Sequence, residues 1–385
     1  MRLIKRTLDQ IDSPIGETYA LLTEHKPTRP LLNLAQAAPA YPAPPEIVER
    51  IAAAAGEPHA GAYVGIAGLD PLRAAFATEI SNAYNAFVEP AHILVTAGCN
   101  QAFCVAAMTL TAPGDEMIVP LPYYFNHDMW LRMEGVTPVY VEPGPGWMPD
   151  PDAARHAVTS RTRAILLVTP GNPTGVTVPS ETIASFAAIA AEHDIALIID
   201  ETYRNFRDTT DPAHGLFADP AWGEKVVSLH SFSKDFAIPG YRVGALVASP
   251  SLIREAMKVL DCVQICAPRI GQEAALAGLL HATSWRQGKA LEVAEKLAAF
   301  RTAMASRPGG FELAAGGAYF GWIRHPFPGR PTTDVVRDLL LSYDMLMIPG
   351  TAFLPDDRHM IRASVANLPL DDIEEFAYRL AEAGS

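Results

Sequence analysis

Lys234 lies in the stretch HSFSKDFAIPGYRVG (230–244), in which two serines surround it and an arginine follows eight positions later. A lysine held where water is scarce loses its charge more easily, and its neutral amine can then attack a carbonyl group. Ser231 and Ser233 offer hydroxyl donors, and Arg242 offers a planar guanidinium fork that suits phosphate. A single lysine in a loop is usually a solvated surface charge, but this group of residues predicts an amine beside an anion-binding cradle.

Asp200 is the second candidate for chemistry, because it ends the apolar run IALIID (195–200). A carboxylate at the end of a buried strand needs a hydrogen-bond donor or a charged partner. It can cap the following segment ETYRNF, or it can pair with a protonated ring nitrogen and keep a pyridine ring able to accept electrons. The sequence leaves both interpretations open.

Two turns could hold an anion or a polar ligand at the ends of apolar runs. TPGNPTG places Asn172 between prolines and glycines that bend the backbone. TAGCNQAF joins a strand to a helix, and its backbone N–H groups lie at a helix N-terminus, which favours anions. The residues concerned are Gly98, Cys99 and Asn100.

Short apolar runs alternate with helical patterns and predict the elements that position these residues. Strands are expected at 92–98, 116–122, 163–170, 195–200, 226–230 and 244–249, with helices at 100–111 and 180–193. This alternation is typical of a parallel sheet wrapped by helices. In such a sheet, ligands bind beyond the carboxyl ends of the strands. That edge should carry Gly98, Tyr124, Asn172, Asp200 and the segment 231–234.

The chain of 385 residues is long for one hydrophobic core, so its length predicts two domains. From about residue 290 onward, short strands and helices alternate in an α+β pattern. We therefore expect an α/β fold with a mostly parallel sheet in a large domain over 46–288. A smaller α+β domain would combine residues 1–45 with 289–385.

Charge and cysteine usage exclude several classes of function. The net charge of -13 disfavours nucleic acid and anionic membranes as partners. No run reaches the roughly 20 apolar residues of a membrane-spanning helix, and the N-terminus lacks a signal-peptide core, which favours a cytoplasmic protein. The four cysteines form no CxxC pair, so we expect free thiols and no metal site.

Taken together and in order, these motifs resemble the class I/II aminotransferases, which are pyridoxal-phosphate enzymes of fold type I in the aspartate aminotransferase superfamily. The blocks that carry the resemblance are AYVGIAGLDPLRAAFA, TAGCNQAF, PLPYYFNHDMW, TPGNPTG, IIDETYRNF, SFSKDFAIPGYRVG, MLMIPGTAF and HMIRASVAN. Any one block could arise by chance, whereas the ordered set covers most of the chain and is specific.

The resemblance implies a role for each matching residue. Lys234 would form the internal aldimine and move the proton between the substrate α-carbon and the cofactor. Asp200 would pair with the pyridine nitrogen, Asn172 and Tyr203 would bond the phenolic oxygen, and Tyr124 would stack on the ring. The phosphate would be held by Gly98, Cys99, Asn100, Ser231, Ser233 and Arg242.

The resemblance also implies a shared active site and a carboxylate clamp. Tyr63 would reach the phosphate of the other subunit in a homodimer, and Arg362 would bind the substrate α-carboxylate. The family often has glycines where NLAQAAPAY stands, so the backbone contact near Ala37 departs from the pattern. Arg269 is either a surface arginine or a ligand for a distal carboxylate. Aromatic candidates for an apolar pocket are Tyr41, Tyr123 and Trp130.

The expected activity is transfer of the amino group of an L-amino acid to a 2-oxo acid by a ping-pong mechanism. A fold type I lyase, such as a C–S β-lyase or a decarboxylase, shares the same cofactor motifs and stays an alternative. A pyridoxal-phosphate-binding regulatory domain is less favoured, because only about 30 residues precede LLNLAQAAP, too few for a helix-turn-helix module.

Overall fold

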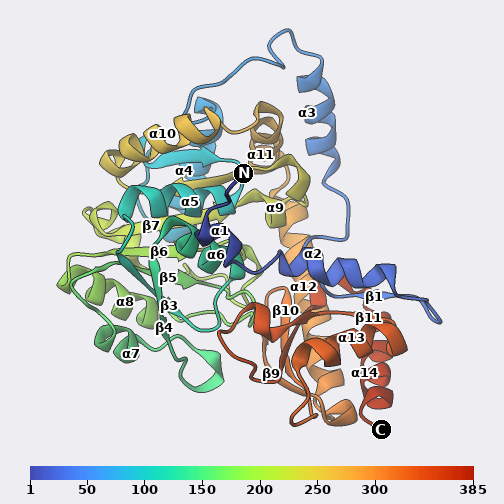
Figure 1. The fold of residues 1–385 in the computed structure, drawn as a ribbon. Helices are drawn as coiled ribbons and strands as arrows, with labels where there is room; N and C mark the ends of the chain where they lie inside the picture. Colours follow the sequence, from blue (N-terminus) through green and yellow to red (C-terminus); the bar gives the residue numbers. More distant parts are fainter.

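The computed structural model describes residues 1–385, and its centre is a seven-stranded sheet in the order β2-β8-β7-β6-β5-β3-β4 (Figure 1). All neighbouring strands in it pair in parallel except those that pair with β8. The strands are β2 (Ile93–Thr96), β3 (Glu116–Pro120), β4 (Thr137–Val141), β5 (Thr162–Val168), β6 (Ala196–Asp200), β7 (Val226–Ser231) and β8 (Gly244–Val247). The predicted mostly parallel sheet of an α/β fold is therefore confirmed.

The reversed direction of β8 decides where Arg242 lies. Gly244, the first residue of β8, pairs with Thr96 at the end of β2 and with Ser231 at the end of β7. The start of β8 thus lies at the carboxyl edge of the parallel strands. Arg242 precedes β8 by two residues and so joins the residues that follow the other strands.

Both faces of this sheet are covered by helices, because its strands are apolar on both sides. Ile165 and Leu167 pack toward α4, α8 and α11, whereas Leu166 and Ile198 pack toward α5, α6 and α10. This alternation is the two-residue period of a strand buried on both faces. The surrounding helices are α3 (Pro45–Ala55), α4 (Asp70–Tyr84), α5 (Cys99–Leu110), α6 (Phe125–Glu134), α7 (Pro151–His156), α8 (Ser180–Glu192), α9 (Phe232–Asp235), α10 (Pro250–Gln264) and α11 (Arg269–His281).

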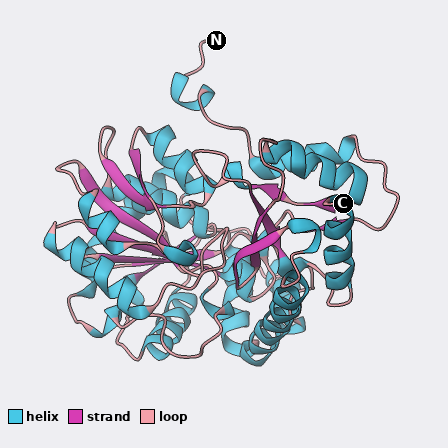
Figure 2. Cartoon of the chain, turned by 90° about the horizontal axis from the view of Figure 1, so that it is seen from below, coloured by secondary structure: helices cyan, strands magenta, loops and turns pink.

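A second, four-stranded sheet in the order β12-β13-β10-β9 lies beside the first, and Figure 2 shows the two groups of strands apart. Its pairs are antiparallel, and a short parallel pair, β1 with β11, joins the N-terminal region to the C-terminal part. The elements here are β1 (Leu32–Asn33), β9 (Glu312–Gly317), β10 (Phe320–Arg324), β11 (Met345–Leu346), β12 (Ile348–Pro349), β13 (Met360–Ser364), α12 (Thr283–Met304), α13 (Thr332–Tyr343) and α14 (Asp372–Ala383). The predicted division of the chain stays a prediction, and its boundary at 288 falls inside the continuous helix α12.

The remaining elements are short. The N-terminal segment forms α1 (Lys5–Leu8) and α2 (Pro14–Ala20) before β1. The 3-10 helices are η1 (Leu21–Thr23), η2 (Pro90–His92), η3 (Pro145–Trp147), η4 (Arg204–Phe206), η5 (Leu216–Ala218), η6 (Trp222–Glu224), η7 (Pro239–Tyr241), η8 (Pro308–Gly310), η9 (Gly350–Ala352) and η10 (Val365–Asn367). None of the helices combines the length and the apolar character needed to cross a membrane.

Candidate active site

A cavity of about 270 Å³ opens at the carboxyl edge of the seven-stranded sheet. Ten residues predicted from the sequence line it, namely Cys99, Asn100, Tyr124, Asn172, Asp200, Tyr203, Ser231, Ser233, Lys234 and Arg242. Five further lining residues were not predicted: Gln36, Ala38, Val168, Thr202 and Pro239. The topology brings these side chains to one sheet edge, since all but Arg242 lie at or after the end of a parallel strand and Arg242 precedes the antiparallel β8.

Lys234 projects from α9, the short helix that follows β7 directly. Its Nζ forms no hydrogen bond or ion pair with another residue of the chain. Burial, followed by the positive charges of Arg242 and Arg362, lowers the pKa of Lys234 to about 8. A substantial fraction of this amine is therefore neutral near physiological pH, which is the form that attacks a carbonyl group.

Asp200 is held from two sides at the end of β6. Its Oδ1 accepts a hydrogen bond from the backbone N–H of Thr202 at 2.9 Å, and its Oδ2 lies 3.4 Å from Nε2 of His127. Burial raises the pKa of Asp200, but His127 and the Thr202 contacts outweigh burial, so the pKa lies below its ordinary value. Asp200 therefore stays ionised and can hold a proton on a neighbouring ring nitrogen.

His127 is a residue that the sequence reasoning missed. It is almost fully buried on α6, and its ring lies 4.2 Å from that of Phe103. Its Nε2 lies 3.4 Å from Asp200 without the geometry of a hydrogen bond, and its Nδ1 has no partner. The signal was present in PLPYYFNHDMW, because His127 follows Tyr124 by three residues and such pairs share a helix face. His127 lies against Oδ2 of Asp200, whereas the Thr202 N–H bonds Oδ1.

An anion cradle forms where β2 leads into α5. Gly98 has a φ of 88°, and a Cβ there would lie 2.6 Å from Nη2 of Arg242, so a larger residue would displace the guanidinium. The first N–H groups of α5, from Cys99 onward, have no carbonyl acceptor within the helix. Arg242 donates to the carbonyl oxygens of Ala97 and Pro239 at 3.2 and 2.9 Å, and no carboxylate pairs with it. The cradle thus presents uncompensated positive charge.

Arg362 on β13 is a second cation without an acidic partner. Its Nη1 donates to Oδ1 of Asn172 at 3.0 Å, its Nη2 donates to the carbonyl of Ala35, and its buried Nε has no partner. The guanidinium lies 5.0 Å from the ring centre of Phe353 and 5.4 Å from that of Phe320. Burial lowers the pKa of Arg362 to about 10, which still leaves it charged at neutral pH. A buried charge of this kind is stabilised by an anion.

The two tyrosines of the cavity are hydrogen-bond donors. Burial raises the pKa of both Tyr124 and Tyr203, so both hydroxyls stay protonated. Tyr124 accepts a hydrogen bond from Nδ2 of Asn126 at 3.0 Å, and Tyr203 packs against Tyr319 and Phe320. Each hydroxyl can thus bond a negatively charged oxygen in the cavity.

Four predicted residues are not among those that line the cavity, namely Gly98, Arg362, Tyr63 and Ala37. Gly98 and Arg362 adjoin the lining residues Arg242 and Asn172, respectively. The side chain of Tyr63 is 77% exposed on the segment between α3 and α4. Ala37 packs toward the cluster of Tyr203 and Tyr319, while its neighbours Gln36 and Ala38 line the cavity. The segment around Ala37 thus borders the cavity, with Gln36 and Ala38 as its lining residues, and its contact with the substrate stays a prediction.

Arg269 is not available as a free cation. It lies 3.4 Å from Glu273 and 3.8 Å from Glu57, and Arg50 pairs with the same two glutamates. Two arginines and two glutamates thus neutralise each other at the contact of α3 and α11.

The three aromatic candidates lie outside the cavity lining. The hydroxyl of Tyr41 lies 3.1 Å from that of Tyr319, and Tyr123 stacks on Tyr140 with ring centres 5.2 Å apart. Trp130 is partly buried on α6, where its Nε1 has no partner. The expected role of these residues in an apolar substrate pocket stays untested.

Comparison with known proteins identifies the family. The profile of "Aminotransferase class I and II" matches residues 29–380. The chain is 30% identical to the "Putative aminotransferase YugH" of Bacillus subtilis over 83% of this chain and 82% of that protein. It is 29% identical to the "Aromatic aminotransferase ISS1" of Arabidopsis thaliana over 91% of this chain and 88% of that protein. A structure of Thermus thermophilus aspartate aminotransferase superposes with a TM-score of 0.89 at 25% identity, covering 100% of both chains. The chain therefore belongs to the class I and II aminotransferase family.

Proposed function

We propose that this protein transfers the amino group of an L-amino acid to a 2-oxo acid, with pyridoxal 5'-phosphate as its cofactor. The observation that carries the proposal is the placement of the Lys234 amine in one cavity with the ionised Asp200 and the cation Arg242. Arg362, bonded to the cavity residue Asn172, adds a second cation. A cofactor that carries a phosphate would neutralise Arg242, and a substrate that carries a carboxylate would neutralise Arg362.

The residues present fit pyridoxal phosphate. Its phosphate suits the cradle of Arg242 and the start of α5, where Gly98 leaves room beside the guanidinium. Its ring nitrogen suits Asp200, and its phenolic oxygen suits Asn172 and Tyr203. When bound, the cofactor supplies an aldehyde that condenses with amines and a protonated ring that withdraws electrons from the attached carbon.

Each side chain then has a distinct task. Lys234 holds the cofactor through its Nζ and later moves a proton at the α-carbon of the substrate, for which a pKa near the working pH is favourable. Asp200 keeps the proton on the ring nitrogen. Arg362 and Asn172 together, here called the carboxylate clamp, orient the α-carboxylate, and Tyr124 covers the ring and excludes water. The donor leaves as a 2-oxo acid before the acceptor enters, so one clamp serves both substrates.

We further propose a homodimer in which Tyr63 reaches the phosphate in the partner's site. Its exposure and its absence from the cavity lining of its own chain support this assignment.

The proposed function is tested by adding pyridoxal phosphate to the purified protein and following the visible spectrum against a panel of L-amino acids. We expect one class of donor to convert the cofactor to its amine form, and a 2-oxo acid to restore the original spectrum. Release of pyruvate and ammonia without an acceptor would instead identify a lyase. An unchanged spectrum with every donor would contradict both.

The pKa of Lys234 leads to a prediction about pH. Uptake of pyridoxal phosphate by the cofactor-free protein requires the neutral amine, and the pKa is lowered to about 8. The uptake rate should therefore rise up to about pH 8 and level off above it, whereas an unperturbed lysine would give a rise up to about pH 10. Rapid-mixing absorbance measurements from about pH 6 to 11 provide the check, with Nα-acetyl-lysine as the reference compound that has an unperturbed side-chain amine. If the uptake rate of the protein kept rising to about pH 10, as the reaction rate of the reference should, the lowered pKa of Lys234 would be contradicted.

Replacing Arg362 with alanine should weaken the binding of α-carboxylates. Loss of a buried, bidentate charged contact costs about 3 kcal/mol, or roughly 10²-fold in KM for an amino acid donor. The rate with a simple amine that lacks the carboxylate should change much less. Steady-state kinetics on both donors make the comparison, and Arg337→Ala, which removes an exposed arginine paired with Glu24, is the control. Equal losses for the two donors would argue against the clamp.

A further inference from the structure

Trp147 has a backbone conformation that is unusual for a large side chain. It ends η3 with a φ of 64°, directly after Gly146 with a φ of 67°. Positive φ is ordinary for glycine but costly for a bulky residue, and it persists only where the surrounding structure demands that side chain position. The indole of Trp147 is therefore held in place by its contacts.

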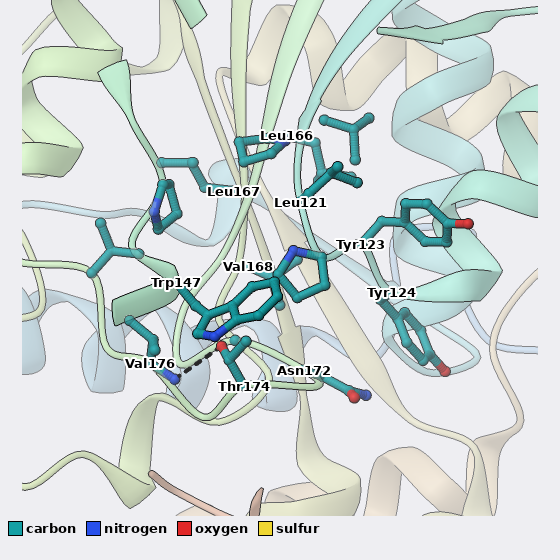
Figure 3. Close-up of a pocket in the computed structure, with 16 residues that line it drawn as sticks. Leu121, Tyr123, Tyr124, Trp147, Leu166, Leu167, Val168, Asn172, Thr174 and Val176 are labelled. Atoms are coloured by element: carbon teal, nitrogen blue, oxygen red, sulfur yellow. Dashed lines mark hydrogen bonds between the residues drawn. The ribbon is translucent and has the colours of Figure 1, made fainter. Parts of the chain in front are cut away.

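The first set of contacts is with the turn that carries Asn172. Trp147 lines a small, mostly apolar cavity together with Tyr124, Asn172 and Thr174, and the space left is about 30 Å³. Figure 3 shows the indole beside Thr174, with the amide of Asn172 directed away from this cavity. The indole thus supports the turn from the side opposite to the carboxylate clamp.

The turn is also restrained on its other side. A Cβ on Gly175 would lie 2.1 Å from the carbonyl oxygen of Gly317 on β9, so the two backbones are in direct contact there. The hydroxyl of Thr174 accepts the backbone N–H of Val176 at 3.2 Å and closes the turn. A shift of the turn toward β9 is blocked by the Gly175–Gly317 contact, and on the side of the small cavity the indole of Trp147 lies beside Thr174 of the turn.

The second set of contacts leads to Arg362. Trp147 packs edge-on against Trp322 of β10, with ring centres 5.7 Å apart. Trp322 packs edge-on against Phe353 at 6.0 Å, and Phe353 lies 5.0 Å from the guanidinium of Arg362. Trp322 also pairs with Arg362 across the sheet. One aromatic chain thus connects Trp147 to the cation of the clamp.

Trp147 therefore contacts the supports of both members of the carboxylate clamp, Asn172 in the turn after β5 and Arg362 on β13. We propose that Trp147 is a positioning residue that fixes Asn172 and Arg362 relative to each other for binding of the substrate α-carboxylate. This proposal rests on the proposed function, because it assumes that the clamp receives the carboxylate of an amino acid. Trp147 itself does not reach the cavity that contains Lys234.

The experiment uses the holoenzyme and three substitutions of Trp147. Trp147→Ala removes the indole and keeps the unfavourable backbone conformation, Trp147→Gly removes the indole and relieves that conformation, and Trp147→Phe keeps an aromatic ring. We expect Ala and Gly to raise KM for the amino acid donor about tenfold, while kcat and the affinity for pyridoxal phosphate change little. Trp147→Phe should recover most of the loss.

A carboxylate without an amino group isolates the clamp from the chemistry. The probe is 3-phenylpropanoate, whose binding is followed through the visible spectrum of the bound cofactor or by competition with the donor. Its dissociation constant should rise by the same factor as KM in the Ala and Gly variants. Phe87→Ala, which removes a side chain that is 75% exposed, is the matched aromatic control and should leave all constants unchanged.

A double-mutant cycle separates positioning from a general structural effect. In the Asn172→Ala background, Trp147→Ala should have a clearly smaller effect on 3-phenylpropanoate binding than in the wild type. The contact between Asn172 and Arg362 is already lost there, and only the support of Arg362 through Trp322 and Phe353 remains to be removed. Independent, multiplicative losses would overturn the proposal, as would equal losses for a donor lacking a carboxylate. Trp147→Leu serves the same comparison should Trp147→Ala fail to fold.

Failure of the proposed function and failure of this inference give different results. If no amino acid changes the spectrum of the wild-type protein, the proposed function fails. If the wild type is active and the Trp147 variants bind carboxylates as the wild type does, this inference alone is contradicted.

Discussion

Lys234→Ala is expected to cause the largest loss of activity of any single substitution. The amine serves both as the attachment point for pyridoxal phosphate and as the group that moves the α-proton. Loss of a positioned acid–base group alone costs about 10²–10⁴-fold, and loss of the attachment adds to this. Turnover should therefore fall by at least this factor, and the visible absorbance band that depends on the lysine should disappear.

The measurements for this variant are the absorbance spectrum after addition of pyridoxal phosphate and the rate of amino transfer with the best donor. Lys258→Ala is the matched control, because Lys258 is an exposed lysine on α10 that pairs with Glu255. The control should keep the wild-type spectrum and rate. An unaltered spectrum in Lys234→Ala would show that another amine binds the cofactor.

Asp200→Asn should give the second large loss, for an electrostatic reason. The substitution keeps the shape of the side chain but removes the negative charge that holds a proton on the ring nitrogen. Removal of one preorganised charge interaction in an active site costs about 10²–10³-fold in kcat. The protein should still retain cofactor, because the cradle near Arg242 and the Lys234 amine are unchanged.

Retention and rate must be measured together to test Asp200. Cofactor content after dialysis should stay near that of the wild type, while the rate of the half-reaction with an amino acid donor falls. Asp194→Asn, in which an exposed carboxylate paired with Lys225 is removed, is the control. Full activity in Asp200→Asn would refute the role of the charge and leave Asp200 as the cap for Thr202.

The sequence correctly predicted the location of those polar residues that follow the end of a parallel strand. Asn172, Asp200 and Lys234 all lie at the edge where the parallel rule placed them, because each apolar run forms a strand of the same sheet. Arg242 precedes a strand, and the rule for strand ends does not place it. Only the antiparallel direction of β8 brings it there, and hydrophobic periodicity does not encode strand direction.

Several features of the site depend on contacts that no local pattern reveals. His127 supports Asp200 across two elements, and Arg269 pairs with Glu273 of α11 and with Glu57, which follows α3. In the segment near Ala37, Gln36 and Ala38 line the cavity, whereas the sequence singled out Ala37. Side-chain direction in an irregular loop is set by packing and not by a repeating period.

The sequence by itself determined the elements, their order and the residue types at the strand ends, because hydrophobic periods and turn residues act over a few neighbouring positions. The tertiary structure decided which of these residues meet. Arg362 and Asn172 are 190 positions apart, and their contact exists only because β13 and the turn after β5 pack together. The connection from Trp147 through Trp322 and Phe353 to Arg362 arises in the same way, since it joins η3 to the four-stranded sheet, whose relative placement is decided by packing.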